Sequence, residues 1–144
     1  MGNEEIKIKI LAFIKGHKLT VISTVDVGGD KPESAVIAFA EKDTLELIFG
    51  TSTKSRKYQN LQKNKNVSFV IGWSDELGTV QYEGVAQELM EEEAAEHGKM
   101  IADKNQNAEK FLTRPDQRYF LVQPTWIRLL DKSKDPDEVH EIIL

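Results

Sequence analysis

The chain has 144 residues, and 24 acidic against 19 basic side chains give it a formal net charge of −5. Hydrophobic residues make up 40% and charged residues 30%, values typical of a globular protein, so we expect a single domain over residues 1–144. The acidic balance argues against a general nucleic-acid binder, and the absence of cysteine excludes disulfides and thiolate chemistry.

The N-terminal segment contains no basic region and no long apolar run. We therefore expect neither a secretory signal nor a membrane span, and a cytoplasmic protein. Within residues 4–17 the apolar side chains fit one face of a helix and also alternate as in a strand. The length of the segment favours a helix that ends near Gly16.

The next part of the chain predicts three strands joined by tight turns. Residues 18–27 are rich in β-branched side chains, and the turn at 26–30 leads into a second strand over 32–40. A further turn at 41–43 leads into a third strand over 44–49. Two hairpins in succession imply antiparallel pairing.

Two more strands are predicted over 67–71 and 79–89, and Gly84 inside the second indicates a bulge or a close backbone approach. Three glutamates then open a helix that ends near Lys104. One further helical turn precedes Pro115.

The last strand is expected over 118–130, with an interruption at Pro124, and the charged residues 131–141 are expected to form a solvated tail. Six or so antiparallel strands with a few short helices are typical of a small barrel. The pattern alone leaves a sandwich open as the alternative.

The stretch Phe49–Lys57 connects the third strand to a short helix. Gly50 is expected to end the strand, and a hydroxyl at Thr53 or Ser55 can cap the helix that runs to Lys63.

Three cations, Lys54, Arg56 and Lys57, fall at or just before the first turn of this helix. A helix N-terminus carries a partial positive charge, so cations there are mildly unfavourable. Cations, hydroxyls and free N–H groups at one place favour an anion site, most naturally for a phosphate. A solvated basic turn is the alternative interpretation.

Four short runs carry a resemblance to a known family: Phe49-Gly50-Thr51, Ser55-Arg56-Lys57, Asn60-Leu61 and Asn66-Val67-Ser68. They resemble the flavin-phosphate segment of the pyridoxamine 5′-phosphate oxidase-like FMN-binding split-barrel family, in its short, general-stress-protein-like form. The likeness extends from about residue 18 to 130. It implies a mainly β fold, a Greek-key antiparallel barrel of six strands with flanking short α-helices.

The resemblance also implies a homodimer with FMN sites at the subunit interface. Arg56 and Lys57 would form the charged clamp on the phosphate, and both are expected to face solvent without ligand. Gln81 could equally be an exposed strand residue, and Trp126 could pack in the core or at the dimer contact. The positions that match cofactor contacts are Ser34, Ala35, Val36, Ile37, Thr51, Ser55, Arg56, Lys57, Gln81 and, from the second subunit, Trp126.

Conventional catalytic groups are scarce, since His17, His97 and His140 are scattered and no metal site is expected. An anion site without acid–base machinery fits a protein whose cofactor carries the chemistry. We expect an FMN-dependent oxidoreductase with a nicotinamide electron donor and an unassigned substrate. The alternatives are a deazaflavin or haem protein, or a flavin-binding module without turnover.

Authentic pyridoxamine phosphate oxidases carry a C-terminal extension that binds the substrate phosphate. No such segment precedes Leu144, so pyridoxamine phosphate is not the expected substrate.

Overall fold

The computed structural model describes residues 1–144. None of its helices is long and apolar enough to cross a lipid bilayer. In chain order the elements are α1 (Asn3–Lys15), β1 (Leu19–Val25), β2 (Pro32–Glu41), β3 (Leu47–Ser52), α2 (Arg56–Lys63), β4 (Asn66–Ser74), β5 (Gly78–Leu89), α3 (Glu91–Lys104), the 3₁₀-helix η1 (Gln106–Phe111), β6 (Gln117–Asp131) and β7 (Glu138–Ile143).

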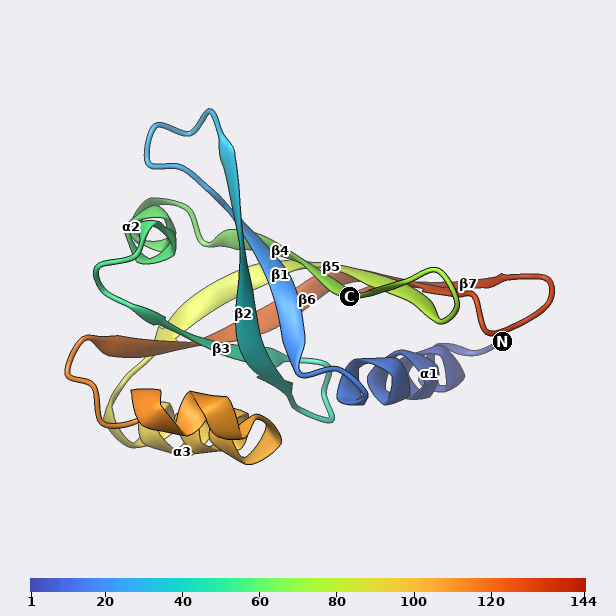
Figure 1. The fold of residues 1–144 in the computed structure, drawn as a ribbon. Coiled ribbons are helices and arrows are strands. Elements are labelled where there is room, and N and C mark those ends of the chain that lie inside the picture. Colours follow the sequence, from blue (N-terminus) through green and yellow to red (C-terminus); the bar gives the residue numbers. More distant parts are fainter.

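The strands form one antiparallel sheet in the order β3-β2-β1-β4-β5-β6-β7 (Figure 1). A further pairing between β3 and β6 joins the two sides of this sheet, so six strands close into a barrel and β7 lies outside it. The closure decides between the barrel and the sandwich, and it confirms the predicted six-stranded barrel with flanking helices.

The third strand differs from its prediction at both ends. Leu45 lies in a turn with a φ of 73°, and the strand begins only at Leu47. The expectation that Gly50 ends the strand is wrong, because Gly50 pairs with Tyr119 inside the β3–β6 ladder. A glycine is required there since a Cβ would lie 2.7 Å from the Tyr119 ring.

The predicted solvated tail at residues 131–141 is also wrong. Residues 138–143 form β7, which pairs with the second half of β6 and packs against α1. His140 and Ile142 point inward and are buried, while Val139 and Ile143 lie on the exposed face. This alternation is a strand signal that the high charge of the segment conceals.

The irregularity expected at Gly84 is confirmed. The register between β5 and β6 shifts between Glu83 and Gly84, and a Cβ at Gly84 would meet the Gln123 carbonyl. Pro124 lies opposite this shift, and β6 continues through it as one strand.

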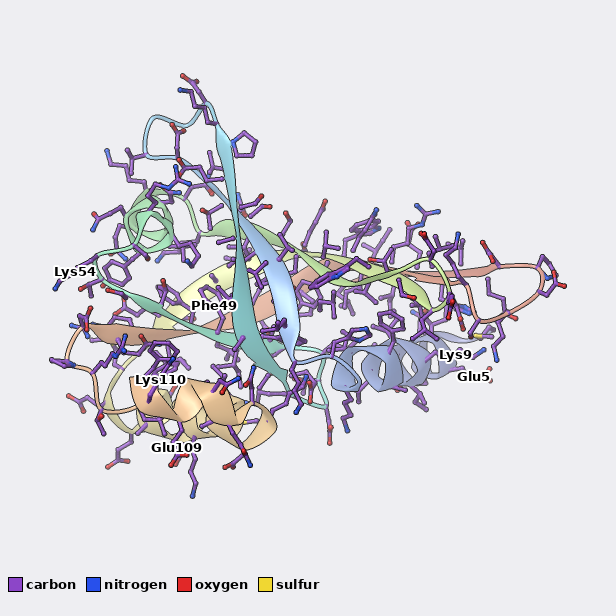
Figure 2. The ribbon with its side chains drawn as sticks, in the orientation of Figure 1. Glu5, Lys9, Phe49, Lys54, Glu109 and Lys110 are labelled. Carbon is purple, nitrogen blue, oxygen red and sulfur yellow. The ribbon has the colours of Figure 1, made fainter.

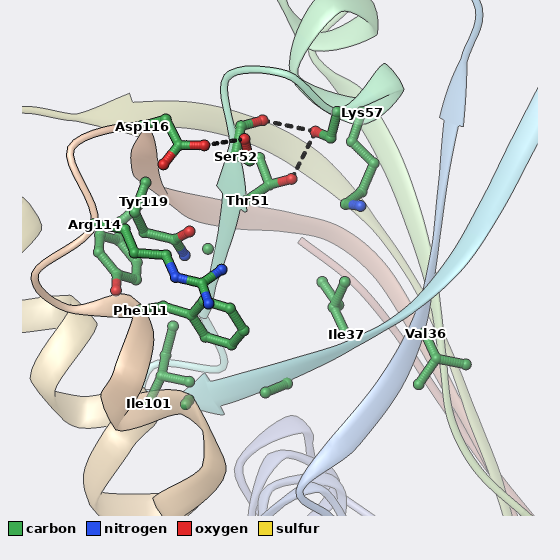
Figure 3. Close-up of a pocket in the computed structure, with 15 residues that line it drawn as sticks. Val36, Ile37, Thr51, Ser52, Lys57, Ile101, Phe111, Arg114, Asp116 and Tyr119 are labelled. Carbon is green, nitrogen blue, oxygen red and sulfur yellow. Dashed lines mark hydrogen bonds between the residues drawn. The ribbon is translucent and has the colours of Figure 1, made fainter.

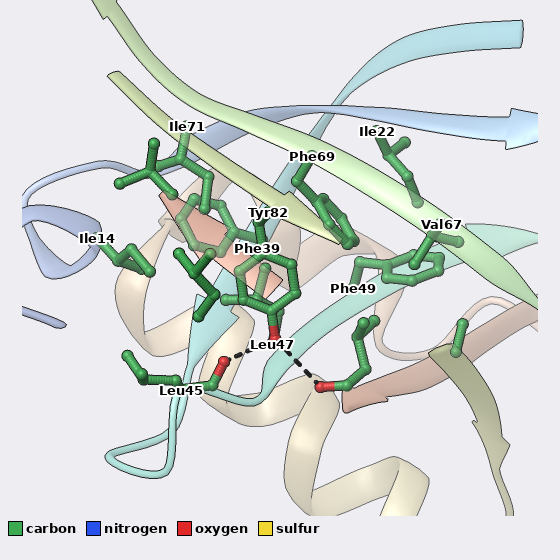
Figure 4. Close-up of a cluster of buried hydrophobic side chains, with 14 of the residues drawn as sticks. Ile14, Ile22, Phe39, Leu45, Leu47, Phe49, Val67, Phe69, Ile71 and Tyr82 are labelled. Carbon is green, nitrogen blue, oxygen red and sulfur yellow. Dashed lines mark hydrogen bonds between the residues drawn. The ribbon is translucent and has the colours of Figure 1, made fainter. Parts of the chain in front are cut away.

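Aliphatic and aromatic side chains together fill the barrel (Figure 4). Phe49 stacks on Phe120 with ring centroids 5.1 Å apart, and the buried Tyr82 hydroxyl donates to the Leu45 carbonyl at 2.7 Å. Figure 2 shows Phe49 inside the barrel and Lys54 at the outer edge of the loop before α2. The same core includes residues of α1 and α2, so these two helices pack against the barrel core.

The Tyr119 ring fits between two glycines, Gly50 of β3 and Gly98 of α3. A Cβ at Gly98 would lie 2.7 Å from this ring, closer than real contacts allow. Both glycines therefore fix the spacing between α3 and the β3–β6 ladder.

Gly98→Ala is expected to destabilise the protein by about 1–3 kcal/mol, since the added methyl overpacks the site. This loss should outweigh the roughly 1 kcal/mol that alanine normally gains over glycine within a helix. Urea denaturation measures the free energy of unfolding. In a Tyr119→Leu background the same change should be neutral or stabilising, and equal destabilisation in both backgrounds would contradict the steric explanation.

Candidate functional site

A cavity of about 390 Å³ lies between β2, β3, the start of α2 and the α3–η1 segment (Figure 3). Its volume falls within the ordinary range of small-molecule sites. One part of its lining was predicted from the sequence, namely Val36, Ile37, Thr51, Ser55 and Lys57.

The hydroxyl groups at the start of α2 are bonded to one another and to the backbone. Ser55 is the N-cap of α2, and its hydroxyl accepts from the Tyr58 N–H at 3.2 Å. The same hydroxyl lies 2.7 Å from that of Thr51 and donates to the Ser52 carbonyl at 2.8 Å. The expected capping role of Ser55 is confirmed, and these bonds hold the loop rigidly beside the cavity.

Lys57 is the free cation at this end of the cavity. Its side chain is half-buried and lines the cavity, whereas the nearby Glu33 carboxylate pairs with Arg56 instead. Burial, and secondarily the positive charge of Arg56, lowers the pKa of Lys57 below the usual lysine value. An anion entering the cavity would offset both effects through its opposite charge.

The sequence predicts that Arg56 and Lys57 both face solvent, and this prediction is wrong for Lys57, which is half-buried. Arg56 is exposed but bonds to Glu33 at 2.8 Å, and Glu33 also accepts from the Asn60 amide at 2.8 Å. Arg56 lies outside the main cavity, in a smaller adjoining hollow of about 80 Å³ that Ser34 and Ala35 also line. Its charge is therefore partly compensated, whereas that of Lys57 is not.

Gln81 and Trp126 do not line the cavity. Strand pairing aligns Val36, Val21, Val70 and Gln81 in one row across β2, β1, β4 and β5. Trp126 pairs with Glu83, which lies two residues beyond Gln81 on β5 and therefore on the same face. Because directly paired residues share a face, these side chains lie on the outer surface of the sheet.

The other half of the lining was not predicted from the sequence; it comes from α3, η1, the segment before β6 and the first residues of β6. The pairing register of β3 with β6 could have revealed one of these residues, Tyr119, because it lies opposite Gly50. No local pattern signals the others, since the barrel must close before they meet. The missed residues are Ile101, Ala108, Phe111, Arg114, Asp116, Gln117 and Tyr119.

The histidines lie elsewhere. His17 bonds to the Phe13 carbonyl at 2.9 Å, His97 to the Glu93 carbonyl at 2.7 Å, and His140 to Glu138. No three His, Cys, Asp or Glu side chains gather as a metal site would require.

A family model described as pyridoxamine 5′-phosphate oxidase matches residues 6–131, which is most of the chain. The chain belongs to the pyridoxamine 5′-phosphate oxidase family. This membership agrees with the resemblance carried by the segment around the start of α2.

A curated relative and two solved structures resemble the chain over most of its length. General stress protein 26 of Bacillus subtilis (strain 168) is 26% identical over 135 residues, covering 93% of this chain and 94% of the relative. General Stress Protein 26 from Bacillus anthracis str. Sterne has a TM-score of 0.75 at 24% identity, over 97% of this chain and 99% of the other. HutZ, the haem storage protein from Vibrio cholerae, has a TM-score of 0.70 at 19% identity, over 83% and 89%. At these identities the two structures show a shared fold.

An anion held by Lys57 is expected to bind less tightly as pH rises through the lowered pKa of this lysine. Only the protonated amine attracts the anion, so affinity is full below that pKa and lost above it. Calorimetric titration with sulfate between about pH 7 and 10, where sulfate itself does not titrate, measures the effect. Lys57→Arg should keep its affinity over this range, and a flat profile for the unchanged chain would contradict the assignment.

Proposed function

We propose that this chain binds FMN in the cavity, with the flavin phosphate at the start of α2, and acts as a flavin-dependent oxidoreductase on a small molecule. A nicotinamide cofactor would be the electron donor. The observation that carries the proposal is the half-buried, unpaired ammonium of Lys57 beside the first turn of α2.

The donor set of the cavity fits a phosphate group. Lys57 provides a cation, and the first N–H groups of α2 have no partner inside the helix. The apolar side chain of Ile37 lines the neighbouring wall, which suits a flat ring system. When bound, FMN would supply the hydride or electron transfer that amino-acid side chains of the lining cannot carry out themselves.

A flavin suits the cavity better than haem does. HutZ is described as a haem storage protein and shares the fold, so haem is the natural competitor. Haem iron commonly takes a histidine ligand, and His17, His97 and His140 all lie outside the cavity lining.

A homodimer with shared cofactor sites is part of the proposal. Val36 lines the cavity and also begins the outer row that leads to Gln81. Val36 and Val70 in this row are 59% and 39% exposed. A second copy packed on this face would cover the valines and bring its own Gln81 or Trp126 toward the cavity mouth.

Lys57→Ala is expected to weaken FMN binding by about 1.5–3 kcal/mol, the usual contribution of a charge-assisted hydrogen bond. Arg56→Ala should cost less, because Glu33 already pairs with Arg56. Quenching of flavin fluorescence on titration with the folded variants measures both affinities.

The visible absorption spectrum of the purified protein provides the accompanying test. A flavin spectrum, or stoichiometric uptake of added FMN, is expected. A haem spectrum would contradict the flavin assignment. A Lys57→Ala variant that binds FMN as tightly as the unchanged chain would contradict the placement of the phosphate.

Val70→Asp is expected to convert dimers to monomers, because it places a charge at the centre of the proposed interface. Val27→Asp is the matched control, since Val27 is 53% exposed but lies beyond the end of β1 in the β1–β2 loop. Sedimentation velocity distinguishes the two states. A monomeric unchanged chain, or a Val70→Asp variant that remains dimeric, would rule out this interface.

A further inference from the structure

The far end of the cavity, beside η1, carries a second cation that the phosphate proposal does not use. We propose that this end is a subsite for the carboxylate of a small planar acid, bound by Arg114. The inference rests on the proposed oxidoreductase function, because the acid would be its substrate.

Successive backbone turns fix the position of Arg114. Its N–H donates to the Phe111 carbonyl at 3.1 Å, and its own carbonyl accepts from the Gln117 N–H at 3.2 Å. The guanidinium carbon lies 4.7 Å from the centre of the Phe111 ring, a cation–π arrangement that orients the planar group. Figure 3 shows the guanidinium pointing into the space that the lining residues enclose.

Arg114 has no carboxylate partner within the protein. Arg56 and Arg118 form ion pairs with Glu33 and Glu88, at 2.8 Å and 3.8 Å, whereas Arg114 forms none.

The acidic group of the same cavity lining does not pair with the guanidinium. Asp116 lines the same cavity, but its carboxylate accepts from the Ser52 hydroxyl at 2.7 Å. This bond is the main cause of its lowered pKa, and the charges of Lys54 and Arg114 contribute less. The carboxylate is thus held against β3, and the N–H donors of Arg114 stay available.

The surroundings of Arg114 define the class of ligand. A guanidinium presents planar, paired donors that match a carboxylate, and the exposed Arg114 keeps these donors accessible to a ligand. The adjacent walls are formed by Ile101, Ala108, Phe111 and the ring of Tyr119. A flat apolar body with one carboxylate complements this combination.

The two free cations also divide the cavity. Figure 3 shows the amine of Lys57 and the guanidinium of Arg114 approaching the enclosed space from different sides. Lys57 lies on α2 and Arg114 follows η1, so a phosphate at one and a carboxylate at the other do not compete for the same donors.

The test uses benzoate as the probe and benzamide as its uncharged counterpart, titrated calorimetrically into the full chain with and without added FMN. Arg114→Gln is expected to weaken benzoate binding at least about tenfold and to leave benzamide unchanged. Lys110→Gln is the matched control, because Lys110 also lies over Phe111, at 5.3 Å, but does not line the cavity. Circular dichroism checks that each variant is folded, and Arg114→Lys should restore part of the affinity.

Benzoate binding that depends on Arg114 and not on Lys110 supports the subsite. The same pattern in a chain that takes up no FMN also supports it, while overturning the flavin assignment. The proposal is overturned if the unchanged chain binds no benzoate, if benzamide binds equally well, or if Lys110→Gln weakens binding as much as Arg114→Gln.

Discussion

The pairing of β3 with β6 is the contact on which the candidate site depends. It sets Thr51 opposite Arg118 and Ser52 opposite Gln117, so the loop that leads into α2 lies beside the segment that follows η1. The Ser52–Asp116 hydrogen bond continues this contact beyond the last pair of the ladder. Without this closure the two halves of the cavity lining would belong to opposite edges of an open sheet.

The distribution of charge follows from the same geometry. The chain is acidic overall, with a net charge of −5, and two basic groups near the cavity, Arg56 and Arg118, have carboxylate partners. Lys57 and Arg114 are the two lining cations that lack one. Of the two, Lys57 is held partly out of water, and an unpaired cation in that position lowers stability, a cost typical of sites that bind a ligand of the opposite charge.

Local signals in the sequence predicted the local features of the fold. Ser55 could be predicted as a cap because capping depends on the residue and its immediate neighbours, and Gly84 marked a bulge for a similar reason. Gly50 misled the prediction because glycine both breaks strands and permits close approach. Only its partner across the ladder, Tyr119, distinguishes the two roles.

The candidate site was half predictable for the same physical reason. Lys57 and Thr51 belong to a contiguous run beside a helix start, whereas Phe111 and Arg114 join them only through barrel closure. The partial compensation of Arg56 by Glu33 likewise depends on contact between α2 and β2, which no spacing along the chain reveals.

The origin of the cavity walls has a consequence for folding. They come from two parts of the chain, 36–57 and 101–119, that are distant in sequence. A ligand that contacts both recognises only the closed barrel and adds its binding free energy to that state alone. The cavity therefore couples ligand concentration to global unfolding. A bound ligand should slow the opening of the β3–β6 ladder more than the opening of any other pair of strands.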